Sequence, residues 1–161
     1  MSVTRVAYAA EGWGEGELWF DGPRLVWHEL PAAQRPVREA DRGKGSGEVR
    51  RIVHALERYF HGERVDLASV RLELDDLTPF QRAIAAALRR VPWGEIVSYR
   101  DLAHAAGYAN AQRAAGTFCA RNRFPLFLPC HRVVSANGLG GYGSLGADYK
   151  RRLLELEGVT V

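Results

Sequence analysis

The sequence predicts an α+β protein in which a small N-terminal α/β domain precedes a mainly helical, winged-helix-like domain. Short runs of aromatic and β-branched residues, separated by Gly and Pro turns, dominate the beginning of the chain. Helix-start signatures and helical spacing dominate after residue 77. The net charge also changes, from −3 over residues 1–76 to +6 over residues 77–161. We therefore expect two domains, 1–76 and 77–161.

A short antiparallel sheet with one helix is expected in the N-terminal domain. The segments with strand composition are Val3–Ala9, Gly16–Phe20 and Arg24–Leu30. From Glu48 to His61 apolar residues recur at helical spacing, and Gly62 ends the run. Pro31–Gly47 is polar and rich in Pro and Gly, which is typical of a connection. Val65–Leu74 alternates weakly between apolar and polar residues and is expected to add a strand.

Three helices are expected in succession in the second domain. Thr78–Gln81 places Thr at a cap, Pro at the first helical position and Gln three residues after the cap, which predicts a helix from Pro79 to about Val91. The next two helices are expected at Tyr99–Ala106 and Ala111–Arg121, the latter capped by Asn110. Two short helices joined by a tight glycine-containing turn indicate a helix-turn-helix, a motif that proteins without nucleic-acid partners also use.

The last of these helices is unusually thin. Its small residues are Ala111, Ala114, Ala115 and Gly116. Small side chains allow either tight packing against another helix or close approach of the backbone to DNA, with Arg113 as the group that reaches furthest. The basic charge of this domain favours an anionic partner such as nucleic acid, although an uneven, solvated surface would give the same count.

Composition excludes several classes of protein. The chain has 161 residues with 47% hydrophobic and 25% charged residues, ordinary values for a globular protein. It has no uninterrupted apolar stretch of about 18 residues, so no membrane span is expected. We see no secretory signal at the N-terminus. Two cysteines cannot build a disulfide framework, and a reducing cytoplasm suits them better.

The strongest chemical signal is Cys130, which follows an apolar run and lies between Pro129 and His131. Thiolate is the reactive form of cysteine, and a nearby imidazole or positive charge, here His131 and Arg132, lowers the pKa of a thiol. In an extended strand adjacent side chains point to opposite faces, so contact between Cys130 and His131 needs a bend or a relaying water. A buried structural thiol is the alternative for Cys130, and we expect Cys119 to be such a packing residue.

Two further features could complete a site around this cysteine. Glu157 ends a helix expected at Asp148–Glu157 and is a candidate for the group that orients His131. Ser135–Gly146 contains five glycines, which permit positive φ and close backbone approach to a ligand. That segment is either one wall of a pocket or a flexible surface loop.

Together these residues resemble the O6-alkylguanine-DNA alkyltransferase family, also called methylated-DNA–protein-cysteine methyltransferases. The resemblance covers Leu77–Gly158, whereas the first 76 residues agree only in length and general α/β character. The matching strings are Thr78-Pro79-Phe80-Gln81, Val91-Pro92-Trp93-Gly94-Glu95, Val97-Ser98-Tyr99, Pro129-Cys130-His131-Arg132-Val133 and Leu153-Leu154-Glu155-Leu156-Glu157-Gly158. An Asn eight residues before the cysteine and a Glu twenty-seven after it make the pattern specific.

The resemblance implies catalytic roles for five residues. Cys130 is the nucleophile and alkyl acceptor. His131 is the base, acting through a water, and Glu157 orients it. Asn122 braces the active-site turn. Tyr99 helps to rotate the target nucleotide and donates a proton to the departing guanine.

It also implies a DNA-binding surface and a pocket. Arg113 would occupy the gap that the extruded base leaves, and the thin helix would lie in the minor groove. The expected DNA-binding residues are Arg113, Tyr99, Ala114, Thr117 and Arg121. The expected pocket residues are Pro125, Val133, Tyr142, Ser144 and Lys150. This chain reads Gly141–Gly146 at a position where the family more often has an aromatic before Ser-Gly-Gly.

The implied function is single-turnover DNA repair, in which an alkyl group moves from O6-alkylguanine in duplex DNA to Cys130. We expect a monomer in the cytoplasm or nucleoid, with double-stranded DNA as partner and no membrane contact. No metal or organic cofactor is expected, since the N-terminal domain has no cysteine for the zinc site that some members carry.

Three alternatives remain at this stage. Relatives that recognise alkylated DNA without repairing it lack the reactive cysteine, whereas this chain has one. A regulator that uses only the helix-turn-helix would leave the Cys-His-Glu spacing unexplained. A cysteine hydrolase would give no reason for an arginine on a thin helix.

Overall fold

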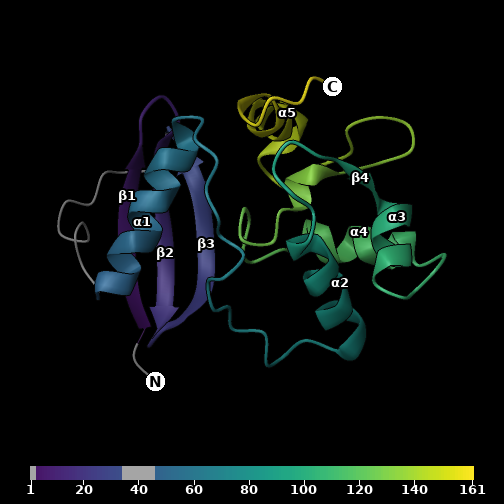
Figure 1. Ribbon diagram of the computed structural model, residues 1–161, viewed down its shortest axis with the longest axis horizontal. Coiled ribbons are helices and arrows are strands. Elements are labelled where there is room, and N and C mark those ends of the chain that lie inside the picture. The colour runs from purple at the N-terminus through teal and green to yellow at the C-terminus, as the bar shows by residue number, and fades with distance from the viewer. Residues whose placement is uncertain (1–2, 34–45) are drawn as a thin grey trace. The chain divides into compact units, whose positions relative to one another are not determined.

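The computed structural model describes residues 3–33 and 46–161 of this α+β protein (Figure 1). The chain divides into two compact units. The first runs to Glu73 and includes the short segment Arg123–Pro125. The second comprises Leu74–Asn122 and Leu126–Val161. The second unit contains every group of the candidate site described below.

The first unit is a three-stranded antiparallel sheet with one helix. Its strands, β1 (Val3–Ala10), β2 (Gly14–Asp21) and β3 (Arg24–Ala32), follow one another in space in chain order. Helix α1 (Gly47–Phe60) lies across the sheet, and the Ser46 side chain caps its first turn (Figure 1). Its apolar stripe is buried, and so are the central residues of the strands.

A buried polar pair lies within this unit. His28 Nδ1 lies 2.7 Å from the carbonyl oxygen of Pro125, and its Nε2 lies 2.6 Å from the Tyr8 hydroxyl. A carbonyl can only accept, so Nδ1 carries the proton and Nε2 accepts from Tyr8. Gly16 makes room for this tyrosine, since a Cβ there would lie 2.4 Å from the Tyr8 ring.

One expectation for this unit is wrong. Val65–Leu74 is not a strand and makes only a single bridge, between Leu72 and Leu25. Asp66 explains part of the difference, because its side chain accepts from the backbone N–H of Ala68 and fixes a turn. The expected connection Pro31–Gly47 lies mostly outside the described residues.

The second unit contains the predicted helices. They are α2 (Pro79–Arg89), α3 (Tyr99–Ala105), α4 (Gln112–Ala120) and α5 (Gly146–Leu156). Two short strands, β4 (Val97–Ser98) and β5 (Val133–Val134), pair in parallel. The capping box before α2 is present in full: Thr78 accepts from the N–H of Gln81, whose side chain accepts from the N–H of Thr78. Helices α3 and α4 form the helix-turn-helix (Figure 1).

One local expectation in this unit is wrong. Asn110 does not cap α4; it has φ of 67°, and Ala111 precedes the helix without a side-chain cap. The apolar run before Cys130 ends in a bend, one of the two arrangements expected, since Leu126 has φ of 74° and Cys130–Arg132 form a 3₁₀ turn. The bend that the Cys-His pair requires is this turn. No helix in the described part of the chain is long and apolar enough to cross a membrane.

Candidate active site

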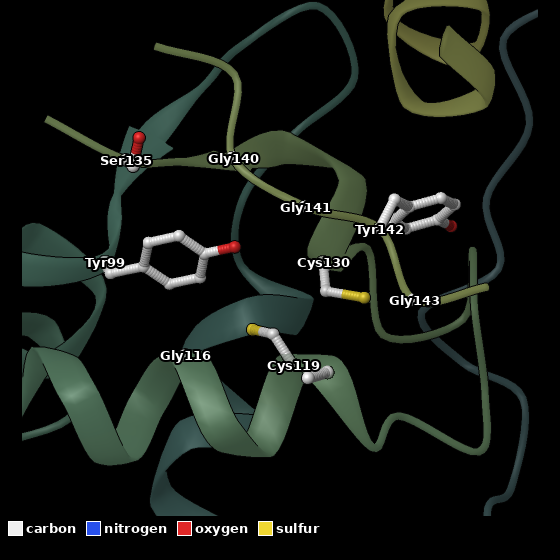
Figure 2. Close-up of a pocket in the computed structure, with 10 residues that line it drawn as sticks. Tyr99, Gly116, Cys119, Cys130, Ser135, Gly140, Gly141, Tyr142 and Gly143 are labelled. Carbon is white, nitrogen blue, oxygen red and sulfur yellow. The ribbon is translucent and has the colours of Figure 1, made fainter. Parts of the chain in front are cut away.

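A cavity of about 310 Å³ lies among residues of the second unit (Figure 2). Helix α3 contributes Tyr99, α4 contributes Gly116 and Cys119, and the 3₁₀ turn contributes Cys130. The glycine-rich segment Gly140–Gly143 forms a further wall, as one interpretation of that segment predicted. Elements far apart in the sequence thus surround a thiol, with enough space for a small planar ligand.

Cys130 is held by donors that favour its thiolate. The side chain is buried, and Asn122 Nδ2 lies 2.9 Å from its Sγ and 2.8 Å from the carbonyl oxygen of Leu128. Hydrogen bonding with Cys119 lowers the pKa of the Cys130 thiol, and the Asn122 amide and the Lys150 ammonium lower it further, against the opposing effect of burial. These donors therefore favour the thiolate, which is the reactive form of cysteine.

Glu157 anchors the residues on the other side of this turn. Its carboxylate accepts from His131 Nε2 at 2.6 Å and from Arg132 Nε and Nη2 at 2.8 and 3.1 Å. Burial raises the pKa of Glu157, but the bonds from His131 and Arg132 outweigh it and hold the pKa at about 2. Arg132 also donates to the carbonyl oxygen of Val91 at 2.8 Å, so its charge is directed at Glu157.

His131 is arranged as a neutral base. Burial lowers its pKa, and the opposing attraction of Glu157 does not restore it. Because a carboxylate only accepts, Nε2 carries the proton of the neutral ring, and Nδ1 has the lone pair. This Nδ1 atom is buried and has no hydrogen-bond partner among the described residues. A buried lone pair of this kind is suited to taking a proton.

Tyr99 lines the cavity, and Lys150 lies beside the tyrosine ring. Burial is the main reason that the pKa of Tyr99 is raised to about 12, so its hydroxyl keeps its proton at neutral pH. Lys150 is fully buried, lies 5.8 Å from the centre of the Tyr99 ring and donates to the carbonyl oxygen of Gly141 at 3.3 Å. Burial lowers the pKa of Lys150. Gly140 has φ of 80°, a conformation that favours glycine, and it lies next to Lys150 Nζ.

The outer face of α4 presents the residues expected to bind DNA. Those exposed on this helix and at its end are Arg113, Ala114, Thr117 and Arg121. Ala115 and Cys119 are buried on the other face. The same short helix therefore offers small and basic groups to solvent and lines the cavity with Gly116 and Cys119.

The expected pocket residues are placed differently from one another. Tyr142 lines the cavity, and Lys150 lies beside Tyr99. Ser144 is exposed, Val133 is fully buried in β5, and Pro125 belongs to the first unit, and none of these three lines the cavity. The sequence did not indicate that Cys119, expected to be a packing residue, lines the cavity. It also did not indicate the bidentate contact of Arg132 with Glu157. No local signal marks either one, because both depend on tertiary contacts.

Enzymes that act on a single nucleobase draw it out of the duplex into a pocket. The second unit combines a helix-turn-helix with a cavity that a buried thiol borders. Residues 79–159 match the family described as 6-O-methylguanine DNA methyltransferase, DNA binding domain. The chain belongs to this family, which confirms the resemblance found in the sequence.

Relatives and a solved structure agree with this assignment. The methylated-DNA–protein-cysteine methyltransferase of Metallosphaera sedula is 45% identical over 106 residues, which are 66% of this chain and 65% of that protein. The protein of the same name from Methanopyrus kandleri is 44% identical over 103 residues, 64% of this chain and 76% of its own length. The crystal structure of Mycobacterium tuberculosis OGT in complex with DNA is similar with a TM-score of 0.77 and 32% identity, covering 95% of this chain and 91% of that one.

Proposed function

We propose that this protein repairs alkylated DNA by moving the alkyl group from O6 of guanine to Cys130, once per molecule. The observation that carries this proposal is the thiol at the cavity, with donors on its sulfur and a neutral imidazole next to it in the chain. Relatives named methylated-DNA–protein-cysteine methyltransferase support the same reaction. DNA is the partner, as it is in the related M. tuberculosis structure.

Activation of the thiol begins with a proton transfer. The Cys130 proton passes through a water to Nδ1 of His131, which becomes an imidazolium stabilised by the Glu157 carboxylate at Nε2. Arg132 fixes that carboxylate from its other side, so the carboxylate oxygen stays aligned with the ring. Asn122 holds Sγ in place while its charge develops.

Alkyl transfer is a single displacement. The Cys130 thiolate attacks the alkyl carbon, the carbon–O6 bond breaks, and guanine departs with the electron pair of that bond. Tyr99 donates its hydroxyl proton to the departing guanine, and a pKa of about 12 keeps that proton in place until then. The product is a thioether, which the protein has no means of cleaving, so each molecule acts once. The reaction as proposed needs no metal or cofactor.

Access to O6 requires the nucleotide to leave the base stack. We place α4 in the minor groove, where its exposed Ala114 and Thr117 leave room, while Arg113 fills the gap left in the duplex. Arg121 contacts the phosphate backbone. A monomer suffices, since every group named here belongs to one chain. Two unbridged cysteines, one of them the acceptor, suit a reducing compartment such as the cytoplasm or nucleoid.

A duplex with one O6-methylguanine inside a restriction site provides the test. Repair restores cleavage by the restriction enzyme, and the repaired fraction should rise in proportion to protein and stop at one equivalent. Arg113→Ala, which leaves the thiol site intact, should lower repair at limiting DNA concentration while retaining reaction with small thiol reagents. Continued turnover beyond one equivalent, or tight binding without repair, would refute the proposal in favour of an enzyme of another class or a recognition module.

A further inference from the structure

A second thiol borders the cavity next to the nucleophile. Cys119 on α4 and Cys130 on the 3₁₀ turn both line the cavity, and they are 8% and 4% exposed. Figure 2 shows them on facing elements at the border of the same space. No step of the reaction above uses Cys119. Packing alone does not require a thiol at position 119, beside the reactive Cys130.

The two thiols are neighbours at this cavity, which both side chains line. Hydrogen bonding with Cys119 is the main reason that the pKa of the Cys130 thiol is lowered. Two adjacent buried thiols cannot both ionise without strong repulsion, so one becomes the thiolate and the other keeps its proton. The Asn122 amide, which donates to Cys130 Sγ at 2.9 Å, decides which sulfur carries the charge. Cys119 is thereby the proton-bearing member of the pair.

Resting on the function proposed above, we propose that Cys119 is a further catalytic residue of the alkyl transfer. Its S–H donates a hydrogen bond to Cys130 Sγ and stabilises the thiolate that forms when the Cys130 proton passes to His131. During the displacement Cys119 neither gains nor loses a proton. The proton of Cys130 goes to His131, and the electron pair of Sγ forms the bond to the alkyl carbon.

Other groups around the nucleophile shape the same equilibrium. Lys150 from α5 and Tyr99 from α3 face the pair of thiols, and His131 is adjacent in the 3₁₀ turn. Hydrogen bonding with Cys130 is the main cause of the raised pKa of Cys119, to which burial adds, and the Cys130 pKa is lowered in turn. Such a donor also weakens the thiolate slightly as a nucleophile. The intrinsic nucleophilicity of a thiolate falls as the pKa of its thiol falls, with a Brønsted slope of about 0.4–0.5.

Three substitutions separate donation from packing. Cys119→Val removes the donor and keeps a similar volume. Cys119→Ser keeps a donor and loses volume. Cys119→Ala loses both. If Cys119 only packs, the Val variant should match the natural protein best in the reactivity of Cys130. If Cys119 is a donor, the Ser variant should match it best.

The DNA-free protein is alkylated with iodoacetamide over pH 5–10, and peptide mass gives the rate of alkylation at Cys130. The pH at which this rate reaches half of its maximum is the midpoint of Cys130 ionisation. In Cys119→Val we expect the midpoint to rise by about one to two pH units and the rate at neutral pH to fall roughly tenfold or more. Cys119→Ser should keep the natural midpoint. Cys130→Ala reports the background labelling of Cys119. Should Cys119→Val lose its native circular dichroism, Cys119→Ala provides the variant without a donor.

Two results would overturn the inference: a natural midpoint in the donor-free variants, or a midpoint in Cys119→Ser that shifts as far as theirs. Because the reagent needs no DNA, the midpoint stands apart from the proposed function. Absence of alkyl transfer from DNA with the expected midpoints would refute the proposed repair and leave the hydrogen bond between the thiols established.

Discussion

Replacing Glu157 with Gln tests how the buried carboxylate holds the site. The pKa of Glu157 lies at about 2, against an ordinary value of 4.5, because the bonds from His131 and Arg132 outweigh burial. A group with a depressed pKa contributes its stabilisation above the unfolded value and loses it as the pH falls through the folded value. The difference of about 2.5 pH units corresponds to roughly 3 kcal/mol of folding free energy at neutral pH. The side chain is buried, so solvent screens little of this.

Urea denaturation at several pH values measures the effect. At pH 7 we expect Glu157→Gln to be about 3 kcal/mol less stable than the natural protein, since the amide cannot ionise and leaves Arg132 and His131 without their buried anion. Between pH 4.5 and 2 the difference should shrink, because the natural protein alone loses this contribution. Glu155→Gln, at a position exposed to solvent on the same helix, serves as the matched control. An equal stability of the two proteins at pH 7, or a difference that does not change with pH, would refute the reasoning.

Three other substitutions have defined expectations. Asn122→Ala removes the donor to Cys130 Sγ and should slow iodoacetamide alkylation at pH 7 by roughly tenfold or more, a result contradicted by an unchanged rate. Thr78→Ala removes the cap of α2 and should lower the free energy of unfolding by about 1 kcal/mol in urea; no change would mean that the cap contributes nothing. Gly16→Ala places a Cβ 2.4 Å from the Tyr8 ring and should cost about 1–3 kcal/mol, whereas a neutral effect would show that the buried ring can move.

The sequence predicted the features that local patterns determine. Helices α1 to α5 follow from apolar spacing and from caps such as Thr78, because these signals lie within a few residues of one another. The three strands of the first unit follow from short runs of aromatic and β-branched residues separated by Gly and Pro turns. The acceptor motif around Cys130 was found for the same reason, since its residues are adjacent in the chain.

Local turns and tertiary contacts account for what the sequence did not predict. Val65–Leu74 looks like a strand, yet a local turn at Asp66 leaves it a single bridge. The apolar run before Cys130 bends because Leu126 adopts a positive φ, which an apolar sequence pattern does not predict. Cys119 looked like packing because its helix gives no sign of the cavity that α3 and the 3₁₀ turn complete.

The mass of the intact protein after incubation with duplex DNA containing one O6-methylguanine tests the central claim most directly. We expect a gain of one methylene mass that peptide analysis assigns to Cys130, that stops at one equivalent and that is absent from Cys130→Ala. Restoration of guanine in the DNA without a mass gain, or a gain at any other residue, would contradict the account.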